Sequence, residues 1–119
     1  MGSLVRRGEI RLVDLEPARG AEANKRRPGI VVSNDGSNDA VVRHRRGMVT
    51  IVPLTSNVAR VYDFQVLLPA ADTGLRLDSK AQAEQTRSMD ISRIGNVMGE
   101  VPEDLMQRVD AALRVHLGL

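Results

Sequence analysis

The sequence predicts a mainly β fold of the α+β type: five to seven short strands in a small, curled, mostly antiparallel sheet, followed by one amphipathic helix. Three observations predict it. Short runs rich in β-branched residues recur between clusters of Gly, Pro, Asn, Asp and Ser. Sustained helical spacing of apolar residues begins only after Pro102. The 119 residues suffice for one apolar core, so we expect a single domain over 1–119, in which 1–4 are a tag remnant or disordered.

The expected elements follow from local composition. Strands are predicted at 8–15, 28–35, 48–54 and 64–69, around 80–88, and within 91–101 after a short helical turn. The segments 16–27 and 55–63 are predicted loops, Ser33–Asn38 a turn and 40–47 a basic connector. The helix is expected to begin at Pro102, with Glu103 and Asp104 in its first turn and Arg114 and His116 near its end.

Composition excludes several classes of function. Hydrophobic residues make up 42% and charged residues 27% of the chain, as in a soluble globular protein. Cysteine is absent, which excludes disulfides and thiolate metal sites, and only two histidines occur. Two histidines without a cysteine argue against most metal sites, and the sequence contains neither the P-loop nor the dinucleotide-binding motif of nucleotide chemistry, so we expect no metal and no cofactor. No apolar run has the length of a membrane span, so we expect a cytoplasmic protein with no membrane partner.

Positive charge is concentrated in the first half of the chain. Residues 1–60 carry eleven Lys and Arg against six Asp and Glu, whereas residues 61–119 carry six against nine. Fifteen of the seventeen cations are Arg, whose planar guanidinium suits phosphates and stacks on bases. A polyanionic partner is one interpretation, and a coding bias toward Arg is the other.

The clearest candidate for chemistry is Arg27, next to Pro28. Proline restricts the preceding residue to extended conformations, which fixes the direction of the arginine where a strand begins. Glu22 lies on the same predicted loop, and Thr55 and Ser56 follow another predicted strand. The sequence alone does not bring these residues together, and a surface cation, a loop charge and a turn residue remain the plainer interpretation.

Five segments occur in a characteristic order and spacing: "RRGEIRLVDLEPARGAEANKRRPGIVVSND", "VTIVPLTSN", "FQVLLPA", "LDSKAQAEQTRSMD" and "VPEDLMQRVDAAL". Together they resemble the MazF/PemK family of toxin–antitoxin ribonucleases, from about residue 6 to 117. The resemblance implies an SH3-like β-barrel with a C-terminal helix, a homodimer, and a metal-independent, sequence-specific endoribonuclease of single-stranded RNA (an mRNA interferase) that inhibits translation and growth. It also implies an antitoxin whose flexible tail covers the RNA groove.

The same resemblance assigns roles to individual residues. It implies that Arg27 and Thr55 are catalytic, that Glu22 is the loop glutamate, and that Glu84 and Gln85 contact RNA. We expect further RNA contacts from six residues near these positions: Lys25, Arg26, Ser56, Asn57, Tyr62 and Arg87. Tyr62 and Phe64 are the chain's two aromatic residues, and Tyr62 is the candidate for stacking on a base.

The implied reaction explains why a cation stands at a strand entrance. The 2′-hydroxyl attacks the phosphorus, and the products are a 2′,3′-cyclic phosphate and a 5′-hydroxyl. A fixed guanidinium at Arg27 can donate two hydrogen bonds to the phosphate oxygens as their charge grows, and Thr55 can add a third. Glu22 is the more natural base because an arginine keeps its proton far above neutral pH.

Some expectations stay open. The first loop carries "GAEA" (20–23) where many relatives carry Gly-Ser-Glu-Gln, so the cleavage motif is not inherited from the resemblance. The tract 43–47 either extends the RNA track or is a solvated loop. Two alternatives remain besides the nuclease: a toxin of the same fold that inhibits DNA gyrase by protein contact, and an inactivated relative that only sequesters antitoxin.

Overall fold

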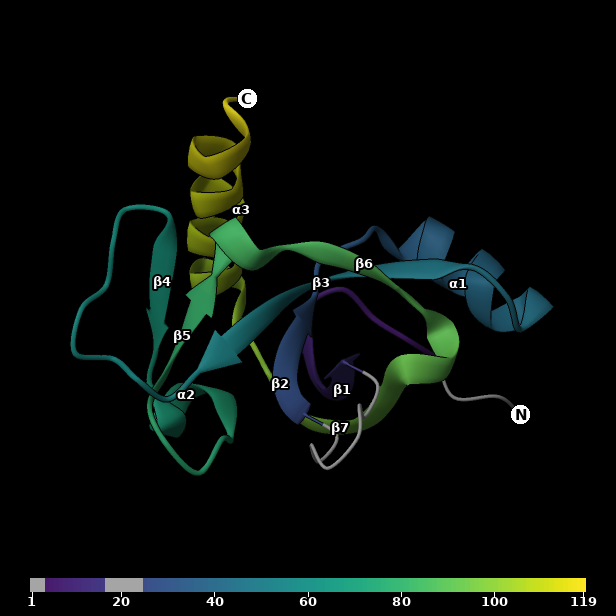
Figure 1. Ribbon diagram of the computed structural model, residues 1–119, viewed down its shortest axis with the longest axis horizontal. Helices are drawn as coiled ribbons and strands as arrows, with labels where there is room; N and C mark the ends of the chain where they lie inside the picture. The colour runs from purple at the N-terminus through teal and green to yellow at the C-terminus, as the bar shows by residue number, and fades with distance from the viewer. Residues whose placement is uncertain (1–3, 17–24) are drawn as a thin grey trace.

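The computed structural model describes residues 4–16 and 25–119, and Figure 1 labels the elements in chain order. The strands found there are β1 (Glu9–Glu16), β2 (Lys25–Val31), β3 (Met48–Thr55), β4 (Gln65–Leu68), β5 (Ser79–Gln82), β6 (Arg87–Asp90) and β7 (Ile94–Glu100). The helices are α1 (Asp35–His44), α2 (Ala70–Thr73) and α3 (Glu103–Leu117), and two short 3₁₀ turns are η1 (Ala83–Gln85) and η2 (Ile91–Arg93).

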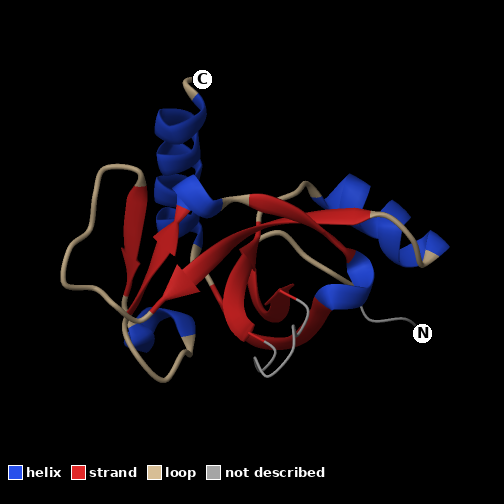
Figure 2. Ribbon diagram, in the orientation of Figure 1, coloured by secondary structure: helices blue, strands red, loops and turns tan. Residues whose placement is uncertain are grey.

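The strands form one strongly curved, antiparallel sheet (Figure 2). Its order is β4-β5-β3-β2-β1-β7, and β6 pairs with the first half of β3. Within the described residues β4 and β7 do not pair with each other, so the sheet is barrel-like but open. The helix α3 packs against β4 and η1. The predicted mainly antiparallel sheet with a C-terminal helix is confirmed.

The central strands are buried on both faces, and this explains their continuous apolar runs. On β2, Ile30 enters a core cluster that α3 covers with Leu105 and Val109. The next residue, Val31, enters a second cluster, which α1 covers with Val41. Since neighbouring residues of a strand point to opposite faces, the two clusters lie on opposite sides of β2.

The helix α1 corrects the sequence-based prediction for residues 33–47, which expected a turn and then a basic connector. The Asn34 side chain caps the helix by accepting a hydrogen bond from the Ser37 amide at 2.8 Å. Asn38 is fully buried, and its side-chain amide donates to the Ser33 carbonyl at 2.9 Å. Asn, Asp and Ser favour turns and helix N-caps alike, and here the capping and the burial of Val41 favour the helix.

The bounds of β2 and the number of strands around 80–88 also differ from the prediction. β2 begins at Lys25 rather than Pro28, so Arg27 lies within a strand, and β2 ends at Val31. The region around 80–88 contains two strands, β5 and β6, which η1 separates.

The predicted C-terminal helix is confirmed. α3 begins after Pro102, has Glu103 and Asp104 in its first turn, and buries Leu105, Met106, Val109 and Ala112. No helix in the described part of the chain combines the length and the apolar character that crossing a bilayer requires.

Candidate functional site

The site lies where β2 and β3 separate. The two strands pair at Gly29–Pro53, Ile30–Val52 and Val31–Ile51. Continuing this register by two residues sets Arg27 opposite Thr55, but the pairing of β2 with β3 ends at Gly29–Pro53, and at Leu54 and Thr55 β3 pairs only along its other edge, with β5. Pro28 has no N–H to donate, which agrees with the end of the β2–β3 ladder at Gly29. The gap left between the two strands opens into a pocket.

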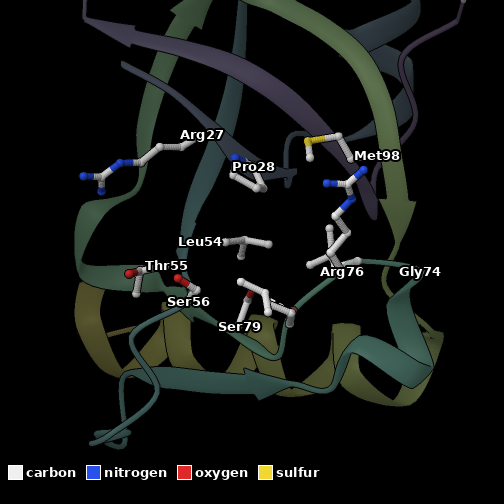
Figure 3. A pocket seen from close by; sticks show the side chains of 11 residues that line it. Arg27, Pro28, Leu54, Thr55, Ser56, Gly74, Arg76, Ser79 and Met98 are labelled. Carbon is white, nitrogen blue, oxygen red and sulfur yellow. Dashed lines mark hydrogen bonds between the residues drawn. The ribbon is translucent and has the colours of Figure 1, made fainter. Parts of the chain in front are cut away.

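The pocket has a volume of about 580 Å³ and is built from four separate segments (Figure 3). Its lining comprises Arg27 and Pro28 of β2, Leu54, Thr55 and Ser56 at the end of β3, residues 74–77 and Ser79 between α2 and β5, and Met98 of β7. Arg27 and Thr55 lie on one side of it, and Arg76 and Met98 lie on the other. The structure therefore brings Arg27, Thr55 and Ser56 to one pocket, as the proposed chemistry requires.

The two proposed catalytic side chains of the pocket differ in how they are held. The Thr55 hydroxyl accepts a hydrogen bond from the Asn57 amide at 3.3 Å, so the turn after β3 orients it. Arg27 is exposed, and no described carboxylate forms an ion pair with it. A guanidinium that no described carboxylate neutralises, on the same side of the pocket as a half-buried hydroxyl, favours binding of an anion.

The strand geometry separates the cations of β2. Arg26 is exposed, and the alternation of side chains along a strand directs it to the face opposite Arg27. The proposed base, Glu22, and the side chain of Lys25 lie outside the described residues.

Tyr62 lies in the exposed loop between β3 and β4 and does not line the pocket. Its ring stacks on Phe64 with centroids 5.3 Å apart, and its hydroxyl accepts a hydrogen bond from Arg60 at 3.1 Å. The buried Lys80 donates to the Arg60 carbonyl at 2.6 Å. This loop is therefore internally bonded beside Ser56, and Phe64 already occupies one face of Tyr62.

The residues Glu84, Gln85 and Arg87 lie in and just after η1 and do not line the pocket either. Glu84 accepts a hydrogen bond from the Gln65 side chain at 2.8 Å, and the same side chain accepts one from the Tyr62 amide at 3.2 Å. Gln85 and Arg87 are exposed. Glu84 thus supports the start of β4 and the loop before it.

Among the pocket residues that the sequence does not single out are Arg76 and Leu77, which follow α2, and Met98 of β7. Arg76 stands between two leucines in a segment whose only local signal is a turn. Only the packing of α2 against β7 brings it opposite Arg27, and no spacing in the sequence reports that contact.

The site offers cations and hydroxyls rather than metal ligands. No group of three or more His, Cys, Asp or Glu side chains that could hold a metal ion occurs in residues 4–16 and 25–119.

Outside the pocket, the Ser92 side chain and amide donate hydrogen bonds to Asp90 and hold the pKa of that carboxyl below its ordinary value of 3.8.

The fold and the pocket together define a class: a small curved β protein whose cationic pocket suits a phosphate-bearing ligand. A family model described as "PemK-like, MazF-like toxin of type II toxin-antitoxin system" matches residues 6–117. The chain belongs to this family.

Individual relatives agree with the family model over nearly the whole chain. Endoribonuclease MazF9 of Mycobacterium tuberculosis is 53% identical over 116 residues, which cover 98% of both proteins. MazF from Deinococcus radiodurans matches with a TM-score of 0.76 and 30% identity, over 98% of this chain and 99% of that one. An endoribonuclease in complex with its cognate antitoxin, from a mycobacterial species, has a TM-score of 0.73 and 27% identity, over 97% and 96%.

Proposed function

We propose that this toxin-family protein is a metal-independent, sequence-specific endoribonuclease that cleaves single-stranded RNA, inhibiting translation and growth. The observation that carries the proposal is that Arg27 and Thr55 line one side of the same pocket. The relatives named as endoribonucleases support it. A cationic pocket without a metal cluster among the described residues can act on RNA because the nucleophile, the 2′-hydroxyl, belongs to the substrate.

The reaction we propose is an internal transesterification. The 2′-oxygen forms a bond to phosphorus, and the bond from phosphorus to the 5′-oxygen breaks, which leaves a 2′,3′-cyclic phosphate and a 5′-hydroxyl. Negative charge grows on the non-bridging oxygens in the transition state. Arg27 donates to these oxygens through its planar guanidinium, and the Thr55 hydroxyl donates from the end of β3.

Two proton transfers complete the reaction. Glu22 is our proposed base for the 2′-hydroxyl, because a carboxylate is unprotonated at neutral pH whereas arginine stays protonated there. Arg27 is our proposed proton donor for the departing 5′-oxygen. A Glu22→Gln variant tests the base: its rate should lose the acidic limb of the pH profile while its affinity for RNA stays unchanged.

The partners we propose are an identical second subunit and an antitoxin whose flexible tail covers the pocket, both acting in the cytoplasm, where the RNA substrate lies. A relative solved in complex with its cognate antitoxin supports the second partner. Arg27 and Arg76, with which no carboxylate of the described residues forms an ion pair, suit an acidic tail.

Incubation of the purified protein with mixed-sequence single-stranded RNA in EDTA tests the nuclease. We expect cleavage in the chelator, cyclic phosphate ends, and loss of cleavage in Arg27→Ala. Arg27→Lys should retain the charge but lose the two-point geometry, so we expect kcat to fall roughly 10²-fold. Arg108→Lys, on the exposed face of α3, is the matched control.

Full activity in Arg27→Lys would show that bidentate geometry is not needed, although the protein would still be a nuclease. Two other results would contradict the nuclease itself. Intact RNA together with an arrested DNA gyrase would favour the protein-binding inhibitor, and intact RNA without that arrest would favour an inactive relative.

A further inference from the structure

The side of the pocket opposite Arg27 has a composition of its own. Arg76 and Met98 lie there (Figure 3), and Leu77 adjoins them in the pocket lining. Leu77 is 64% exposed and Met98 is 41% exposed. One cation therefore stands beside two uncovered apolar side chains, which is the combination that a nucleotide, with its phosphate and its flat base, would complement.

The loop that carries Arg76 and Leu77 is fixed at both ends. At its start, Gly74 adopts φ +82° and its amide donates to the Ala70 carbonyl at 3.0 Å, closing α2. At its end, the Asp78 carboxylate accepts from the Ala70 amide at 2.8 Å. Binding on such a loop costs little conformational entropy, because the loop is ordered in advance.

The contact with β7 fixes this loop against Met98. A Cβ on Gly99 would lie 2.2 Å from the carbonyl oxygen of Thr73, so the backbone of α2 rests directly on that glycine. Met98 precedes Gly99 on the strand. The position of Arg76 and Leu77 relative to Met98 is therefore set by backbone packing rather than by side-chain rotamers.

Charge favours an anion at Arg76. No described carboxylate forms an ion pair with it, and the nearby Asp78 carboxylate is engaged in capping α2. On the facing side of the pocket, Arg27 likewise forms no ion pair with a described carboxylate. The pocket, at about 580 Å³, lies within the range of roughly 300–1,000 Å³ typical of sites that enclose a small ligand.

We propose that Arg76, Leu77 and Met98 form a second nucleotide subsite, in which Arg76 binds the phosphate next to the scissile one and Leu77 and Met98 contact that nucleotide's base. This assignment rests on the proposed function, since it places an RNA strand across the pocket from Arg27 to Arg76. Arg76 sets substrate affinity, and the two apolar side chains set part of the sequence preference.

The first experiment measures binding without cleavage. The probe is a single-stranded oligoribonucleotide cut by the wild type, remade with a 2′-deoxy sugar at the scissile position; if the wild type cuts no RNA, mixed-sequence RNA is used. We expect Arg76→Ala to weaken binding about tenfold and to reduce the slope of log K against log salt by about 0.7, the value for one phosphate contact on a single strand. Arg76→Lys should recover most of the loss, and Arg108→Ala should match the wild type.

Kinetics on the cleavable RNA separate the two arginines. Arg76→Ala should raise KM with kcat nearly unchanged, whereas Arg27→Ala should abolish kcat. Binding of the probe that is the same in Arg76→Ala and Arg108→Ala overturns the subsite, even if the wild type cleaves RNA. Binding that depends on Arg76 in a wild type that does not cleave supports the subsite and overturns the nuclease.

A second experiment tests the base contacts. Sequencing the 5′ ends of cleaved RNA should show a relaxed preference at the position beside the cut in Leu77→Ala and Met98→Ala. Val115→Ala, an exposed apolar residue on α3, is the control and should leave the preference unchanged. An unchanged preference in the Leu77→Ala/Met98→Ala double variant would overturn the assignment of the base to these side chains.

Discussion

The Thr55 hydroxyl is held at the pocket by the turn after β3, where it accepts a hydrogen bond from the Asn57 amide. Thr55→Val preserves the shape of the side chain and removes the hydroxyl, both as a donor to the substrate and as the acceptor of the Asn57 amide. We expect kcat to fall tens- to hundreds-fold, near the roughly 10²–10³ that one transition-state donor contributes elsewhere. Single-turnover cleavage in EDTA, with circular dichroism to verify folding, measures this.

Thr50→Val is the matched control for that substitution. Thr50 lies on the same strand, and its hydroxyl bonds to Ser88 at 3.0 Å, away from the pocket lining. It should keep the wild-type rate. Equal cleavage rates in Thr55→Val and Thr50→Val would show that the Thr55 hydroxyl does not contribute to the reaction.

At this scale the sequence predicted one side of the pocket and not the other. Arg27 was identifiable because Pro28 restricts it and because the surrounding segment resembles a known family. Arg76, Leu77 and Met98 were not, because their proximity depends on α2 resting on Gly99. A contact between segments that are far apart in the chain produces no recognisable spacing of residues in the sequence.

At the scale of elements, the contact between α2 and β7 positions the pocket. Gly99→Ala would place a methyl group 2.2 Å from the Thr73 carbonyl oxygen, so one backbone must move. We expect the free energy of unfolding to fall by about 1–3 kcal/mol, as for other overpacked contacts. Because the loop after α2 moves with it, KM should rise as it does in Arg76→Ala. Chemical denaturation and cleavage kinetics test the two effects.

Gly36→Ala is the control for this glycine. Its Cβ would lie 3.3 Å from the capping side-chain oxygen of Asn34, in the first turn of α1, so only a shift of a few tenths of an ångström is needed. Its stability should stay within about 1 kcal/mol of the wild type. A Gly99→Ala protein with unchanged KM would show that the loop holds its position without the α2 contact.

Among the elements, α3 was predictable and α1 was not. The apolar spacing of α3 extends over four turns and begins at a proline, so its local signals agree. In α1 the signals conflict: Asp35, Gly36 and Ser37 favour a turn, and the cations at 43–46 resemble a solvated connector. The burial of Asn38 and Val41 decides the outcome, and burial is a property of the folded chain.

At the scale of the whole molecule, two apolar clusters on opposite sides of the sheet must be held together at their edges. Arg7 links the parts that cover them. Its guanidinium donates to the Val32 carbonyl at 2.9 Å and to Asp110 of α3, and its amide donates to Asp35 of α1 at 2.6 Å. A single residue in the segment that precedes β1, Arg7, thus connects α1 and α3, the helices that cover the two clusters.

Truncation of the Arg7 side chain should therefore lower the free energy of unfolding and leave kcat unchanged. Arg7→Ala keeps the backbone amide bond and removes the two guanidinium bonds, one of them charge-assisted, from a side chain that is 31% exposed. We expect the free energy of unfolding to fall by about 2 kcal/mol. Arg6→Ala is the neighbouring control: its ion pair with Asp39, at 3.5 Å, is 45% and 43% exposed, so its loss should cost less than about 1 kcal/mol. Urea titration measures both. Equal stability of the two variants would mean that α3 is held by its apolar face alone, and a lower kcat in Arg7→Ala below the unfolding transition would mean that the edge contact also shapes the pocket.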